Sequence, residues 1–259
     1  ARKCDKNENV LTIFKSPRIW GALLGELIGT MVIMMFLLTL GFAQPLYLIF
    51  AMIAVYVVIA GLSGANLNPL ITVGMMATRR MSAIRGVLYI LAQVLGAWIG
   101  LIIVNAFRLG SDTVSELPMM AEITGETFWA VALVELLGAV ILAFCFARSL
   151  RFVRKSPLTF AFAIAGAMTL VVIVGTIIAQ GYFGFADSFM FNPAAALMYQ
   201  ILPTTADGIG ELASMAGLAL AAYVVIPMIG GVIGFYISDV VTRLSAGGYR
   251  CDDDFICEA

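Results

Sequence analysis

The chain has 259 residues, of which 62% are hydrophobic and 12% are charged, and its formal net charge is −1. A soluble domain carries about twice that charged fraction, and without a basic surplus nucleic acid is not an expected partner. The composition therefore indicates an integral membrane protein whose surroundings include membrane lipid.

Six apolar stretches are long enough, or nearly so, to cross a bilayer, which takes about 20 helical residues. They lie at 19–40, 46–62, 83–107, 128–146, 158–179 and 215–237. The first is too long for a signal peptide and no small-residue cleavage site follows it, so we interpret it as a membrane span.

Two shorter segments, at 68–78 and 192–202, each open with Asn-Pro. Asparagine is a good N-cap, and proline at the first helical position loses no hydrogen bond. Both segments are too short to span a bilayer. We therefore expect two re-entrant half-helices, which a membrane tolerates only inside protein or along a cavity.

Charge orients the predicted spans. With six spans, both termini lie on one side, and every lysine and arginine except Arg108 falls on that side. The opposite side carries acidic residues instead: Asp112, Glu116, Glu122, Glu126, Asp207 and Glu211. The positive-inside rule therefore predicts cytoplasmic termini, in the plasma or inner membrane of a cell.

The chain divides into a tail at 1–17, a channel domain at 18–245 and a second tail at 246–259. Three of the four cysteines lie in the two tails. With both tails predicted to be cytoplasmic, we expect reduced thiols. We predict no disulfide framework, no metal site and no cofactor.

The channel domain contains an internal repeat, at about 18–108 and 127–245. Glu26 lies early in the first span and Glu135 early in the fourth, and each is followed after a second span by an Asn-Pro segment. Each half has three spans, so the halves insert with opposite orientations. Paired interrupted segments in such an inverted repeat mark the functional site.

Half-helices entering from opposite faces bring both helix N-termini together near the midplane. Their positive dipole ends favour water or a hydroxyl oxygen and repel cations. The side-chain amides of Asn68 and Asn192 can then donate hydrogen bonds to a passing solute.

The segments SGANLNPLIT and FNPAAA, in register with one glutamate in each half, resemble the aquaporin (major intrinsic protein) family over about residues 18–245. The resemblance implies an all-α fold of six transmembrane helices and two half-helices, a homotetramer with one pore per subunit, and a channel rather than an enzyme. It also implies that Glu26 and Glu135 brace the half-helix loops rather than relay protons, the other role open to glutamates at membrane depth. The central constriction would comprise Asn68, Pro69, Leu70, Asn192, Pro193 and Ala194.

Two residues depart from the family pattern. Leu70 replaces the usual alanine of the first motif, and Ala195 replaces the usual arginine after the second. By spacing from the two asparagines, the outer selectivity filter comprises Leu48, Gln180 or Gly181, Phe189 and Ala195. Such a ring is wide, apolar and without a fixed positive charge. Asp187 is either an outer-mouth carboxylate or an ordinary loop residue.

The pair Pro227-Met228 resembles the corresponding pair of glycerol-conducting members, which favours the aquaglyceroporin branch. We therefore predict passive diffusion of glycerol, other small polyols, urea-like molecules or neutral amines, with water. Three alternatives stay open at this point. They are an ammonium- or cation-permeable channel, a secondary transporter, and a structural protein whose pore is plugged by Leu70.

Overall fold

The computed structural model describes residues 13–40, 45–109, 123, 125–183, 190–199 and 218–245. All regular structure in these residues is helical. Six of the helical segments are long and apolar enough to cross a membrane. The predicted all-α membrane fold is thus confirmed.

The first half contains three long helices and one short helix. The long ones are α2 (Pro17–Leu40), α3 (Pro45–Ser63) and α5 (Ala83–Leu109), and the short one is α4 (Pro69–Ala77). Three of these four helices begin with proline, whose fixed φ suits the first helical position.

The second half repeats this order. It contains α6 (Phe128–Ser149) with a 3₁₀ turn η1 (Leu150–Phe152), then α7 (Pro157–Ile178) with a π-turn η2 (Ala179–Phe183). The short helix α8 (Pro193–Tyr199) follows. The last crossing combines α9 (Leu218–Leu220), a π-turn η4 (Ala221–Val225) and α10 (Ile226–Ser245).

Two predicted spans end three or more residues too early. The fourth continues to Ser149 rather than 146, and the last to Ser245 rather than 237. A hydropathy criterion stops at the first polar residues, whereas the helix continues where Asp239 has a partner, Arg80. Of the predicted half-helix at 192–202, residues 200–202 lie outside the described residues.

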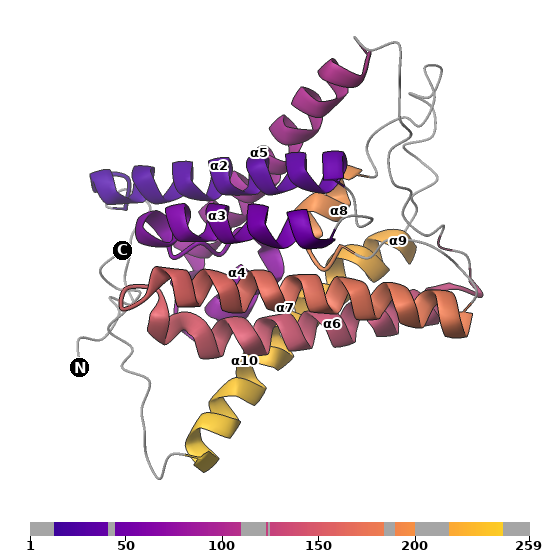
Figure 1. Ribbon diagram of the computed structural model, residues 1–259. Helices are drawn as coiled ribbons and strands as arrows, with labels where there is room; N and C mark the ends of the chain where they lie inside the picture. The colour runs from indigo at the N-terminus through magenta and orange to yellow at the C-terminus, as the bar shows by residue number, and fades with distance from the viewer. Residues whose placement is uncertain are drawn as a thin grey trace.

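The contacts between helices follow the inverted repeat. In the first half α2 packs on α5 and α3, and in the second half α6 packs on α10 and α7. The short helix of each half packs on a long helix of the other, α4 on α10 and α8 on α5. Figure 1 shows α2 beside α3 and α6 beside α7. Exchanging the halves therefore maps one set of contacts onto the other.

Glycines set the closest helix contacts, at equivalent places in the two halves. A Cβ atom on Gly100 of α5 would lie 2.6 Å from the carbonyl oxygen of Met31, and one on Gly234 of α10 would lie 2.4 Å from that of Val140. Small residues let membrane helices approach to backbone contact. Gly21 differs, since it has nothing within 4 Å.

Candidate channel site

The first Asn-Pro motif caps α4. Asn68 has extended backbone angles (φ −159°, ψ 123°), and its Oδ1 accepts the N–H of Leu70 at 3.1 Å. Pro69 occupies the first helical position, as the sequence predicts. Leucine at position 70 leaves the cap intact, because capping depends on Asn and Pro alone. The leucine side chain is fully buried.

The second motif caps α8 in the same way. Asn192 Oδ1 accepts the N–H groups of Ala194 at 3.1 Å and Ala195 at 3.5 Å. Asn68 and Asn192 are both 3% exposed. The two half-helices therefore begin inside the bundle.

The two asparagines also join the halves of the chain. Asn68 Nδ2 donates to the carbonyl oxygen of Phe191 at 2.8 Å, and Asn192 Nδ2 donates to that of Leu67 at 3.2 Å. An amide nitrogen has two N–H groups. Each asparagine thus retains one N–H that no described residue accepts, close to the point where both helix N-termini meet.

The residue before each asparagine has a left-handed backbone, with φ of 51° at Leu67 and 43° at Phe191. Bulky side chains rarely adopt this conformation, which costs about 1–2 kcal/mol. It persists only where the surroundings fix it. At both positions a buried glutamate binds the N–H and the opposite asparagine binds the C=O.

Glu26 accepts four hydrogen bonds. Its Oε1 accepts the hydroxyl of Ser63 and the N–H of Asn66 at 3.0 Å, and its Oε2 accepts the N–H of Leu67 at 2.7 Å and Nε2 of Gln93 at 2.7 Å. A buried carboxyl needs such partners in a membrane. These contacts hold the loop that leads into α4.

Glu135 accepts two backbone hydrogen bonds, from the N–H of Met190 at 3.1 Å and of Phe191 at 3.2 Å. It lacks counterparts to Ser63 and Gln93 among the residues described around it. Among the described residues, the two loops are therefore braced by the same backbone geometry, and the first has two additional side-chain partners.

Sequence reasoning missed the polar residues that complete the first brace. Thr72 Oγ1 accepts from Gln93 Nε2 at 2.9 Å and from Asn66 Nδ2 at 3.3 Å, and it donates to the backbone oxygen of Asn68 at 3.2 Å. A glutamine inside the apolar stretch 83–107 was the available signal, since polar residues at membrane depth need partners.

The structure describes part of the expected outer filter. Leu48 and Ala195 are 2% and 1% exposed, whereas Gln180 and Gly181 in the π-turn η2 are exposed. Phe189 and the expected mouth residue Asp187 lie outside the described residues. The filter as a ring of four residues therefore stays a prediction.

Two capped half-helices that meet inside six spanning helices define a membrane channel fold. A solved structure with this fold is the X-ray structure of the aquaglyceroporin from Plasmodium falciparum, with a TM-score of 0.65 and 19% identity. The match covers 87% of this chain and 98% of that one.

The sequence model of the major intrinsic protein family matches residues 13–241, so the chain belongs to that family. Aquaporin AqpM of Methanothermobacter marburgensis is 32% identical over 94 residues, which is 36% of this chain and 38% of that protein. Probable aquaporin PIP2-4 of Arabidopsis thaliana is 51% identical over 49 residues, 19% of this chain and 17% of that protein. The alignments thus span less than half the length of these relatives. Membership and the six long apolar helices make it a multi-pass membrane protein of this family.

Proposed function

We propose that the protein is a passive, bidirectional channel of the aquaglyceroporin type for small uncharged solutes. Glycerol, other small polyols, urea-like molecules and neutral amines are the solute classes, with water. One observation carries this proposal. The reciprocal bonds of Asn68 and Asn192 leave one N–H on each asparagine for a solute oxygen.

The solute class follows from the residues assigned to the outer filter. Leu48 and Ala195 are uncharged and small or apolar, so the filter has room for more than water. Gln180 or Gly181 and Phe189 complete it, and Asp187 adds a carboxylate at the outer mouth. Pro227, buried in α10, belongs to the Pro-Met pair that favours the glycerol-conducting branch.

The assembly and orientation are part of the proposal. A homotetramer with one pore per subunit follows the family pattern, and the apolar exteriors of the spans support contact with lipid and with other subunits. The basic residues support cytoplasmic termini in a plasma or inner membrane. The channel domain spans 18–245, with repeats at 18–108 and 127–245 and tails at 1–17 and 246–259.

A second candidate is a channel that also conducts ammonium or other cations. Ala195 favours it, because the arginine usual at this position repels cations. A neutral-solute channel is electrically silent, so conductance across a planar bilayer separates the two candidates.

Stopped-flow light scattering on proteoliposomes tests the proposal with water, glycerol and a series of larger polyols. Vesicle volume should recover with glycerol faster than in empty liposomes, and the largest solute that enters measures the filter. The double variant Asn68→Ala/Asn192→Ala should lose this entry. Fast water flux without any solute entry would contradict the assignment to the glycerol-conducting branch.

A further inference from the structure

Helix α10 follows the first half-helix α4 from its start to its end. A Cβ on Gly231 would lie 2.2 Å from the carbonyl oxygen of Leu70, and one on Gly74 would lie 2.4 Å from the ring of Phe235. Further along, the hydroxyl of Tyr236 donates to the carbonyl oxygen of Ala77 at 3.0 Å. Helix α10 thus packs along the whole of α4, up to the membrane face from which this half-helix segment enters.

The end of α4 is closed by a turn that determines where Arg80 lies. Arg79 is left-handed (φ 59°), its N–H bonds the Met76 oxygen at 3.0 Å, and the N–H of Arg80 bonds the Met75 oxygen at 2.9 Å. These are the two hydrogen bonds of a Schellman motif. The motif carries the chain away from the helix axis and directs it toward α10.

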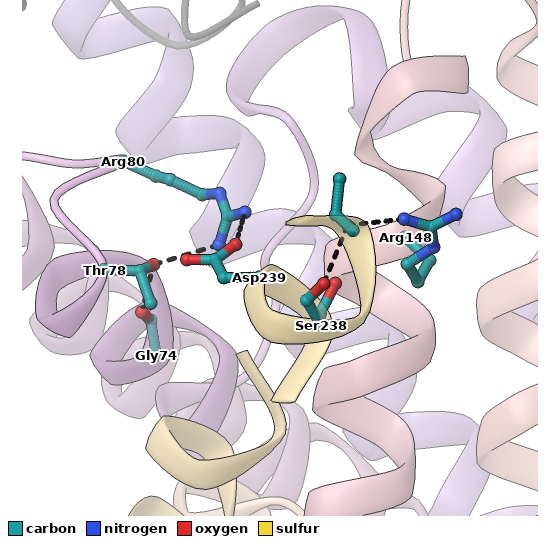
Figure 2. Close-up of polar contacts among 7 residues, drawn as sticks. Gly74, Thr78, Arg80, Arg148, Ser238 and Asp239 are labelled. Carbon is teal, nitrogen blue, oxygen red and sulfur yellow. Dashed lines mark hydrogen bonds and ion pairs between the residues drawn. The ribbon is translucent and has the colours of Figure 1, made fainter. Parts of the chain in front are cut away.

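Arg80 is fixed there by three partners. Its guanidinium forms an ion pair with Asp239 of α10, donates to Thr78 Oγ1 at 3.1 Å and lies 5.4 Å from the centroid of the Phe235 ring. Figure 2 shows Arg80 and Asp239 pointing toward one another across the gap between the two segments. The side chains are 12% and 28% exposed, so the pair lies where the buried interior around α4 reaches water.

Within this ion pair each charge compensates the other. Asp239 lies beside the C-terminal end of α4, which carries a partial negative charge. Without Arg80 the carboxylate of Asp239 would lose its ion-pair partner beside this helix end, although most other basic residues lie on the same predicted side. The arginine usual at position 195 is absent from the other mouth, so the charge at this mouth matters more for selection.

We propose that the Arg80–Asp239 pair is a specificity-determining element at the α4-side mouth of the channel, in which Arg80 neutralises the Asp239 carboxylate so that this carboxylate does not concentrate cations there. The proposal rests on the neutral-solute function proposed above. At a few ångströms in a water-like dielectric, one unit charge changes the local concentration of a small ion about fivefold. The two single neutralisations must then act in opposite directions.

A second arginine provides a matched control. Arg148 of α6 donates to Thr242 Oγ1 on the same helix α10, and Thr242 in turn donates to the backbone oxygen of Ser238. Figure 2 shows Arg148 on the other side of α10 from Arg80. Its partner is uncharged, so Arg148→Gln removes the same unit of positive charge near this face but leaves Asp239 paired with Arg80, and it measures the effect of net charge alone.

The test compares uptake of labelled urea and labelled guanidinium by proteoliposomes, because the two molecules have nearly the same shape and differ in charge. Arg80→Gln should raise the guanidinium-to-urea ratio about fivefold. Asp239→Asn should leave the ratio at or below that of the unaltered protein, the double variant should restore it, and Arg148→Gln should change it less than Arg80→Gln does. The increase in Arg80→Gln should shrink at high ionic strength.

A ratio that rises in both single variants would overturn the proposal, since it would make the pair a packing contact. So would equal effects of Arg80→Gln and Arg148→Gln, or no effect of either. Where Arg80→Gln does not assemble, Arg80→Met keeps an apolar stem over Phe235 and must give the same increase. If the channel function itself is wrong, urea uptake by the unaltered protein will not exceed that of empty liposomes.

Discussion

The side-chain nitrogen of Asn68 lies 2.8 Å from the carbonyl oxygen of Phe191, although 123 positions separate the two residues in the chain. The reciprocal bond joins Asn192 to Leu67 at 3.2 Å. Each asparagine therefore caps its own half-helix with Oδ1 and holds the opposite loop with Nδ2. The side-chain amides of Asn68 and Asn192 therefore both join the two halves of the chain and form the proposed solute site.

Substitution of either asparagine should impair both stability and flux. Asn68→Ala removes a cap worth about 1 kcal/mol and a buried hydrogen bond worth about 1 kcal/mol, and it leaves the Phe191 carbonyl unpaired. We expect a lower melting temperature in detergent and slower glycerol entry per folded channel, with a similar result for Asn192→Ala. Thr39→Ala is the control, because that exposed hydroxyl bonds only within its own helix. Unchanged glycerol entry in Asn68→Ala would remove the asparagine from the solute path.

The two braces should differ in sensitivity to an isosteric change. Each carboxylate oxygen of Glu26 accepts two hydrogen bonds, so the amide NH₂ of a glutamine there would face two donors. Each oxygen of Glu135 accepts one hydrogen bond from the described residues, so the amide NH₂ of a glutamine there would face one donor. Each unsatisfied buried donor costs about 1–3 kcal/mol. Glu26→Gln should therefore lower the yield and thermal stability more than Glu135→Gln, while the channels that do fold still conduct. A well-folded Glu26→Gln protein that conducts protons would instead indicate a proton relay.

The close glycine contacts predict a contrast between two Gly-to-Ala substitutions. A methyl group at Gly96 meets the backbone of α2 at 2.2 Å, which no rotamer change can relieve, whereas one at Gly21 meets nothing within 4 Å. Gly96→Ala should destabilise the protein by about 1–3 kcal/mol through overpacking. Gly21→Ala should be neutral or slightly stabilising. Thermal melting of the two variants decides the matter, and equal melting temperatures would argue against backbone contact between α2 and α5.

The spans, the half-helices and the paired glutamates could be predicted because length, apolarity and the capping chemistry of Asn-Pro are local properties of the sequence. The contact of Gln93 with Glu26 could not, because it depends on how α2 and α5 are rotated about their axes across 67 positions. The left-handed backbone of Leu67 and Phe191 was equally hidden, since neither residue type favours it. The Arg80–Asp239 pair could not be predicted, because the positive-inside rule accounts for an arginine at position 80 without any partner.

Restoring an arginine at position 195 should narrow the proposed outer filter. Ala195 follows Ala194 in the first turn of α8 and is 1% exposed, so a long side chain there has to extend along the solute path or displace its neighbours. We expect Ala195→Arg to lower the glycerol-to-water permeability ratio by about tenfold, a rise of about 1.4 kcal/mol in the barrier. A cation at a helix N-terminus should also lower the stability of the protein by about 0.3–1 kcal/mol. Ala195→Gln is the matched control, because it adds bulk without charge. If both variants reduce the ratio equally, size alone sets the filter, and if a well-folded Ala195→Arg protein passes glycerol as before, position 195 does not line the path.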